Sequence, residues 1–167
     1  MASRPLRPRE VGRNAARVSP LIATVFAGAV LLIALAGLAR IDARTQRLPD
    51  LVTYPLVLMG LVWAFGTQTD LYPHLLGAAL GYGVFWAVEV AYRLVRKRDG
   101  LGRGDAKLLA AGGAWCGALA LPVIVLIASV AALIRVWPRR ADPMLRLAFG
   151  PYLALAIAAV WLVQRAL

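Results

Sequence analysis

Long apolar runs constrain this chain more than any other feature of its sequence. A transmembrane helix needs about 20 apolar residues in a row, and apolar runs near or above this length begin at Leu21, Leu51, Leu75, Leu108 and Leu147. Hydrophobic residues make up 61% of the 167 residues, and charged residues only 16%. The mean hydropathy is +0.72. We therefore predict an all-α integral membrane protein and exclude a water-soluble globular domain.

The apolar run from Leu108 to Val136 decides how many spans the chain has. It is too long for one upright helix, and Gly117 and Pro122 offer a place to turn. With a turn there, one side of the membrane carries 13 Lys and Arg and the other side carries 6. The loops with the thirteen are 40–50, 93–107 and 135–146. By the positive-inside rule these loops face the cytoplasm. A single span would divide the charges almost evenly, so we predict six transmembrane helices.

Basic residues also mark the start of the chain. Residues 1–20 contain five arginines and three prolines, which predicts a basic irregular tail before a six-helix membrane domain at 21–167. The net charge of +11 would suggest a nucleic-acid partner in a soluble protein. Here the basic residues gather in short loops between apolar runs, and no basic stripe alternates with exposed aromatic residues. We therefore expect membrane lipids as partners and no nucleic acid.

Cysteine and histidine give no sign of a metal or cofactor. Cys116 is the single cysteine and lies in an apolar run, so the sequence has neither a disulfide framework nor a Cys-x-x-Cys site. His74 is the single histidine, with no second metal ligand nearby in the sequence. We expect no metal and no cofactor.

Two acidic residues are the candidates for chemistry. Asp42 follows the first span and Asp105 begins the fourth, so both are expected at the cytoplasmic ends of helices. Ionisable groups at membrane depth are functional candidates by default. Two adjacent carboxyl groups share a proton, and then one can activate a water while the other protonates a carbonyl oxygen. The alternative is that both are helix-end residues, paired with Arg44 and Lys107.

Three segments in order along the chain resemble the motifs of one family. In the first, an Asp stands seven residues before a Pro that is followed by Asp. The second is a Gly-x-Gly-Asp string, and the third is a Gly-Pro pair within the last apolar run. The residues are Asp42, Pro49 and Asp50; Gly102, Gly104, Asp105 and Lys107; and Gly150 with Pro151. Together these segments resemble the type IV prepilin peptidases, the membrane-embedded Gly-x-Gly-Asp aspartic proteases.

The resemblance implies a function and roles for these residues. It implies a multi-pass protein of the bacterial inner membrane that removes the short basic leader of type IV prepilins or type II secretion pseudopilins at the cytoplasmic face. Asp42 and Asp105 match the catalytic aspartates, and the motif glycines Gly102 and Gly104 shape the loop. We expect Asp50 to satisfy backbone N–H groups at the start of its helix and Lys107 to anchor its helix at the lipid headgroups.

Larger members of that family carry an N-terminal domain with paired Cys-x-x-Cys motifs and also methylate the new N-terminus. We expect this chain to be a minimal form without the methyltransferase.

Three other hypotheses about function remain open. Asp42 and Asp105 would be ion or proton sites in a non-enzymatic membrane subunit or small transporter. A presenilin-type protease shares Gly-x-Gly-Asp but has Tyr before its first Asp, where this chain has Ile41. A catalytically idle scaffold for pilus assembly is the third.

Overall fold

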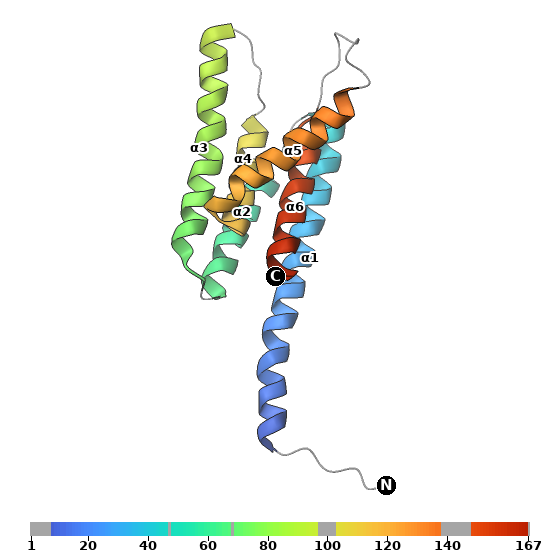
Figure 1. Cartoon of the computed structure of the whole chain (residues 1–167), viewed down its shortest axis with the longest axis vertical. Coiled ribbons are helices and arrows are strands. Elements are labelled where there is room, and N and C mark those ends of the chain that lie inside the picture. Colours follow the sequence, from blue (N-terminus) through green and yellow to red (C-terminus); the bar gives the residue numbers. More distant parts are fainter. Residues whose placement is uncertain (1–7, 47, 68, 97–102, 138–147, 167) are drawn as a thin grey trace.

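The structure is a computed structural model, and it describes residues 8–46, 48–67, 69–96, 103–137 and 148–166. Every regular element in these stretches is helical (Figure 1). The helices are α1 (Pro8–Thr45), α2 (Asp50–Gly66), α3 (Leu71–Arg96), α4 (Arg103–Cys116), the short 3-10 helix η1 (Ala118–Ala120), α5 (Leu121–Val136) and α6 (Gly150–Ala166). The all-α prediction is therefore confirmed for the described residues.

Helix α1 is longer than the sequence predicted. We expected residues 1–20 to be irregular, but α1 begins at Pro8 and runs without a break into the first apolar run. Proline is tolerated at a helix start because its missing N–H is not needed there, and the following Arg and Ala residues are good helix formers. Figure 1 shows this end of α1 projecting beyond the other helices. Residues 1–7 lie outside the described part of the chain.

The predicted turn in the run from Leu108 to Val136 is confirmed. Helix α4 ends at Cys116, and Gly117 follows with a φ of +83°, in the left-handed region that favours glycine. Helix α5 then starts at Leu121, with Pro122 in its first turn, where no backbone N–H is required. The apolar run is therefore two helices joined by a short connection.

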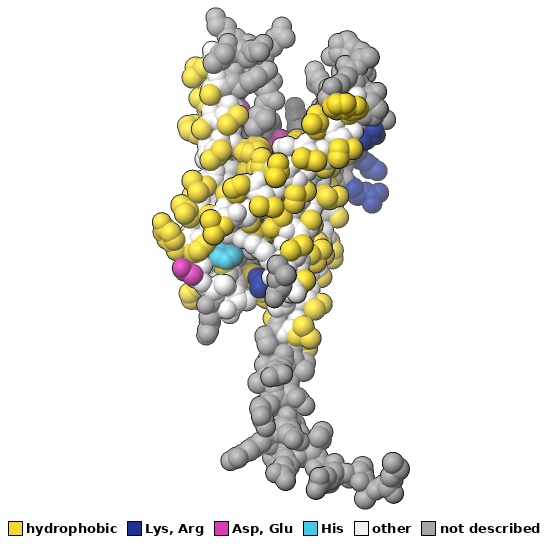
Figure 2. Space-filling view, viewed as in Figure 1, with side chains coloured by type: hydrophobic (Ala, Val, Ile, Leu, Met, Phe, Trp, Pro, Cys, Tyr) yellow, Lys and Arg dark blue, Asp and Glu magenta, His cyan; other side chains and the backbone are white. Residues whose placement is uncertain are grey.

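In the described part of the chain, three helical segments are long and apolar enough to cross a membrane. They are Leu21–Thr45, Leu71–Ala91 and Ala118–Val136. Helices α2 and α6 are apolar but have 17 residues each, and α4 has 14. A span count of six stays a prediction. Figure 2 shows hydrophobic side chains over most of the visible face of the bundle, as expected for a surface in contact with lipid.

Helix α4 occupies the centre of the bundle. It packs against α2, α3 and α6, while α1 packs mainly against α6. The contact between α3 and α4 is a close backbone approach, because a Cβ atom added at Gly77 would lie 2.5 Å from the carbonyl oxygen of Gly113. Small residues permit such approaches between membrane helices. At the other end of α4, its first turn lies beside the start of α2, where Lys107 pairs with Asp50.

Candidate active site

Asp42 lies one turn before the end of α1 and points into the bundle. Asp42 is only 6% exposed. The backbone N–H of Gly150 donates a hydrogen bond of 3.0 Å to Asp42 Oδ2. Gly150 is the first residue of α6, and the first N–H groups of a helix have no partner within it. The start of α6 therefore orients one carboxylate oxygen of Asp42.

The motif pair Gly150–Pro151 fits this role. A Cβ atom added at Gly150 would lie 2.5 Å from Asp42 Oδ2, so a larger residue would displace the carboxylate or the helix. Pro151 is the second residue of α6, where its missing N–H leaves no hydrogen bond unmade. The sequence singled out both residues, but it contained no sign that they contact Asp42.

Asp105 lies in the first turn of α4 and is 8% exposed. It is close enough to Asp42 for the two carboxyl charges to interact. The fold therefore brings together the two acids that the sequence selected, although they come from different helices. Two buried carboxyls near enough for their charges to interact form the arrangement expected for acid–base chemistry.

The loop after α1 packs against the start of α4. A Cβ atom added at Gly104 would lie 2.9 Å from the Cβ atom of Leu48, so glycine is what allows this contact. Gly104 was expected to shape the loop, but the structure places it in the first turn of α4, where the absence of a side chain leaves room for Leu48. Gly102 lies outside the described residues.

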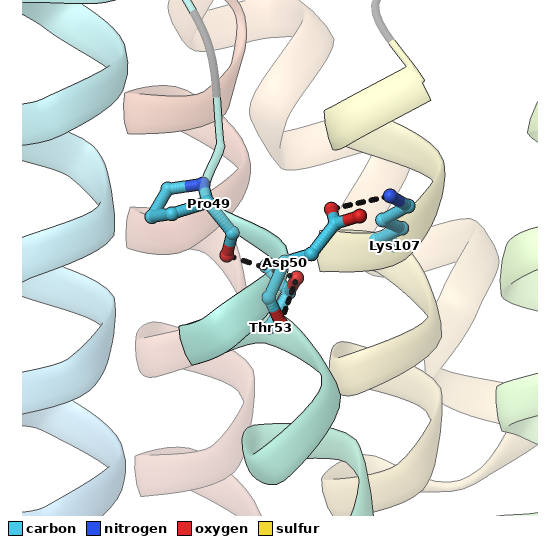
Figure 3. Close-up of polar contacts among 4 residues, drawn as sticks. All are labelled: Pro49, Asp50, Thr53 and Lys107. Carbon is cyan, nitrogen blue, oxygen red and sulfur yellow. Dashed lines mark hydrogen bonds and ion pairs between the residues drawn. The ribbon is translucent and has the colours of Figure 1, made fainter.

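Asp50 and Lys107 form an ion pair between α2 and α4 (Figure 3). Lys107 Nζ donates a hydrogen bond to Asp50 Oδ1, and it also lies 5.2 Å from the centroid of the Tyr54 ring. We expected Asp50 to cap its own helix and Lys107 to reach the lipid headgroups. Asp50 is the first residue of α2, as expected, but its carboxylate binds Lys107 of α4, because α4 passes close to the start of α2. Lys107 also binds Asp50 rather than Asp105, its partner in the alternative interpretation.

Thr53 supports the same turn and was missed by the sequence analysis. It is fully buried, and its hydroxyl group donates to the carbonyl oxygens of Pro49 at 3.2 Å and Asp50 at 3.4 Å. Figure 3 shows these bonds beneath the ion pair. The signal in the sequence was a threonine within the first turn after a proline, where a hydroxyl can reach the preceding carbonyl groups.

A hollow of about 640 Å³ opens beside this loop and is lined by Ile41, Thr45, Leu48 and Pro49. It is adjacent to Asp42 in the sequence and offers space for a bound segment. A second cavity of about 680 Å³ lies between α1 and α2 near Ala27 and Trp63. That cavity is several helical turns from Asp42 along α1, and neither Asp42 nor Asp105 lines either hollow.

Among the described residues, no group of three His, Cys, Asp or Glu side chains is placed to hold a metal ion. His74 Nδ1 lies 2.9 Å from the carbonyl oxygen of Ala114 and links α3 to α4.

Comparisons with known proteins show the family of the chain. Residues 29–136, which include Asp42 and Asp105, match the model of the type IV leader peptidase family. The chain belongs to this family. The resemblance inferred from the three motifs is therefore confirmed.

Individual leader peptidases are similar over most of the chain. The prepilin leader peptidase/N-methyltransferase of Escherichia coli (strain K12) is 48% identical over 126 residues, which cover 71% of this chain and 54% of that protein. The protein of the same name from Dickeya chrysanthemi is 47% identical over 72% of this chain and 44% of its own length. That from Pseudomonas aeruginosa is 40% identical over 81% and 50%. The chain spans about half the length of these relatives. No solved structure matches it.

Proposed function

We propose that this chain is a membrane-embedded aspartic endopeptidase that removes the leader peptide of type IV prepilins or type II secretion pseudopilins. One observation carries the proposal. In a chain that belongs to the leader peptidase family, Asp42 of α1 and Asp105 of α4 are both buried and interact electrostatically.

The two carboxyls can divide the work of peptide hydrolysis. Because like charges in a buried site do not both ionise readily, the pair holds one proton between its members. The ionised carboxylate takes a proton from a water molecule, and the water oxygen attacks the carbonyl carbon of the scissile bond. The protonated carboxyl donates its proton to the carbonyl oxygen. A proton then passes to the leaving amine as the C–N bond breaks.

Gly150 contributes by holding Asp42 in one orientation. Its N–H occupies Oδ2 of Asp42, which leaves Oδ1 free to face water or the other carboxyl group. A hydrogen bond to the carboxylate is strong when the acceptor is charged, so it also stabilises the ionised form of Asp42. On this basis we assign the role of general base to Asp42 and that of general acid to Asp105.

The position of the pair along the helices favours reaction at a membrane surface. Asp42 lies near the end of α1 and Asp105 lies in the first turn of α4, so neither is near the middle of a long helix. This placement supports hydrolysis over an ion or proton site in a transporter, which would need acids near the midplane. The surrounding loops are those with the excess of basic residues, so we assign the active site to the cytoplasmic face of the bacterial inner membrane.

The test is leader cleavage by the purified protein in detergent, followed by mass spectrometry of the product from a prepilin substrate. Asp42→Asn and Asp105→Asn remove one titrating proton each with little change in size. Asp70→Asn is the matched control, because Asp70 lies at the other end of α2 and accepts a hydrogen bond from the Tyr72 N–H. We expect cleavage by wild type and Asp70→Asn alone. Folded wild type that leaves the prepilin intact would overturn the proposal.

A further inference from the structure

Two contacts join the start of α4 to the segment that follows α1. Leu48 packs against Gly104 on one side of Asp105, and the Asp50–Lys107 ion pair lies on the other side. Asp105 therefore stands between two points at which α4 is held to the segment leading into α2.

That segment is in turn tied to Asp42. Gln46 N–H donates a hydrogen bond of 2.8 Å to the carbonyl oxygen of Asp42, and Gln46 has a φ of 52°, which ends α1 with a turn in the left-handed region. The segment that is held against α4 therefore begins one turn beyond Asp42.

The turn that carries Asp50 is stiff. Pro49 has a φ of −71°, close to the value imposed by its ring, and the buried Thr53 hydroxyl bonds the carbonyl oxygens of Pro49 and Asp50. A force on the Asp50 side chain therefore moves the start of α2 as a unit. Figure 3 shows Lys107 reaching this turn from α4.

We propose that Asp50 and Lys107 are a positioning pair that sets the separation of Asp42 and Asp105. The inference rests on the proposed function, and it adds two residues that act through the catalytic pair without touching the substrate. Lys107 does not act as a free cation on the aspartates, because its ammonium group is bonded to the Asp50 carboxylate. The Asp50 side chain is 57% exposed, and ion pairs at such sites add little to stability. The effect of the pair is therefore on geometry.

Four variants test the positioning role: Asp50→Asn, Lys107→Met, the double variant, and the exchange Asp50→Lys with Lys107→Asp. A small misplacement of catalytic groups lowers rates by up to about a hundredfold, so we expect each single variant to lower kcat by about ten- to a hundredfold. KM should stay within about twofold. The double variant should be no worse than either single, and the exchange should recover most of the activity, because it restores the link.

The pH–rate profile gives a second readout. Two carboxyls that interact strongly lose their protons in two well-separated steps, and the active form with one shared proton exists between them. If the single variants let the carboxyls move apart, the bell-shaped profile should narrow, and the exchange should widen it again. Loss of folded protein alone would lower the profile without changing its width. Lys107→Arg, which keeps the pair, should stay near wild type, and Asp70→Asn is the control.

Several results would overturn the positioning role. These are an exchange variant that is folded but as impaired as the singles, an effect confined to KM, and a loss in Lys107→Met that Asp50→Asn does not share. Folding is checked by size exclusion and Tm, which should fall by at most about 4 °C. If wild type cleaves no prepilin, the proposed function fails and the positioning role fails with it. If wild type cleaves but the variants do not follow the pattern, only the positioning role fails.

Discussion

The two ends of the bundle are joined by different kinds of contact. At the end with Asp42 and Asp105, a hydrogen bond from the Gly150 N–H to Asp42 joins α6 to α1, and the Asp50–Lys107 ion pair joins α2 to α4. At the opposite end the rings of Trp115 and Trp161 meet, and hydrogen bonds from Trp115 Nε1 to the Leu56 carbonyl oxygen and from Gln164 Nε2 to the Cys116 carbonyl oxygen join α4 to α2 and to α6. At the first end the contacts orient acidic side chains, whereas at the second end aromatic rings fill the space between helices.

The ring end is built around Trp161 of α6. Its ring meets that of Trp115 edge-on, with centroids 6.4 Å apart, and the guanidinium group of Arg165 lies 5.7 Å from the Trp161 ring. A Cβ atom added at Gly28 would lie 2.5 Å from this tryptophan. The indole N–H groups of Trp161 and Trp63 are buried and have no hydrogen-bond partner among the residues that the structure describes. Ring packing at this end therefore leaves two indole N–H groups unpaired, while the indole N–H of Trp115 donates a hydrogen bond of 2.9 Å to the carbonyl oxygen of Leu56.

Substitution of the proposed catalytic pair should cause the largest loss of activity. Asp42→Asn or Asp105→Asn should lower kcat for leader cleavage by about a thousandfold or more, because neither carboxyl can do both proton transfers. The double variant should be hardly worse than either single variant, since the two residues act as one unit. Cleavage rates and size-exclusion profiles of the three variants decide this. A single variant that cleaves near the wild-type rate would show that the aspartyl mechanism is wrong.

Removal of the Trp161 side chain should lower stability and leave kcat unchanged. Trp161→Ala removes a buried ring in contact with α1 and α4, so the free energy of unfolding should fall by about 3–5 kcal/mol. The kcat of the molecules that remain folded should stay close to wild type, because Asp42 and Asp105 are at the other end. Denaturant unfolding in detergent, combined with kcat per folded molecule, measures both quantities. A large loss of kcat at full folding would mean that the two ends are coupled.

Gly150→Ala tests whether the hydrogen bond from the Gly150 N–H orients the Asp42 carboxylate for activity. The added methyl group would meet Asp42 Oδ2, so the carboxylate must turn or α6 must shift. We expect kcat to fall by about a hundredfold, with less than about 1 kcal/mol of change in the free energy of unfolding. Gly66→Ala is the matched control, because nothing lies within 4 Å of a Cβ atom added there. Equal effects of the two alanines would contradict the role assigned to Gly150.

Asp70→Asn should have the smallest effect. Asn accepts the same hydrogen bond from the Tyr72 N–H, and the residue lies at the start of α3, away from the catalytic pair. Cleavage rate and Tm should both remain within error of wild type. A loss of activity here would show that acidic residues matter through net charge rather than through position.

Much of the fold was open to prediction because it depends on local properties of the chain. Apolar runs, the start of a helix after Pro49, and the turn at Gly117 follow from hydrophobicity and backbone preferences, which are written in adjacent residues. The family could also be inferred, because its motifs are short strings around Asp42 and Asp105. The prediction of an irregular tail was wrong for residues 8–20, because the helix-forming residues between the prolines at 8 and 20 favour a helix there.

The sequence by itself therefore determined a helical membrane protein of the leader peptidase family with two candidate aspartates. Tertiary structure alone decided which residues the motif positions contact. Asp42 contacts Gly150, Asp50 contacts Lys107, and Gly104 contacts Leu48. These contacts join residues that are distant in the chain, and the same side chains had plausible partners nearby, such as a helix end or a lipid headgroup. Only the packing of α4 against α2 and of α6 against α1 brings the chosen partners within reach, because hydrogen bonds act over about 3 Å and carry no signature in local sequence.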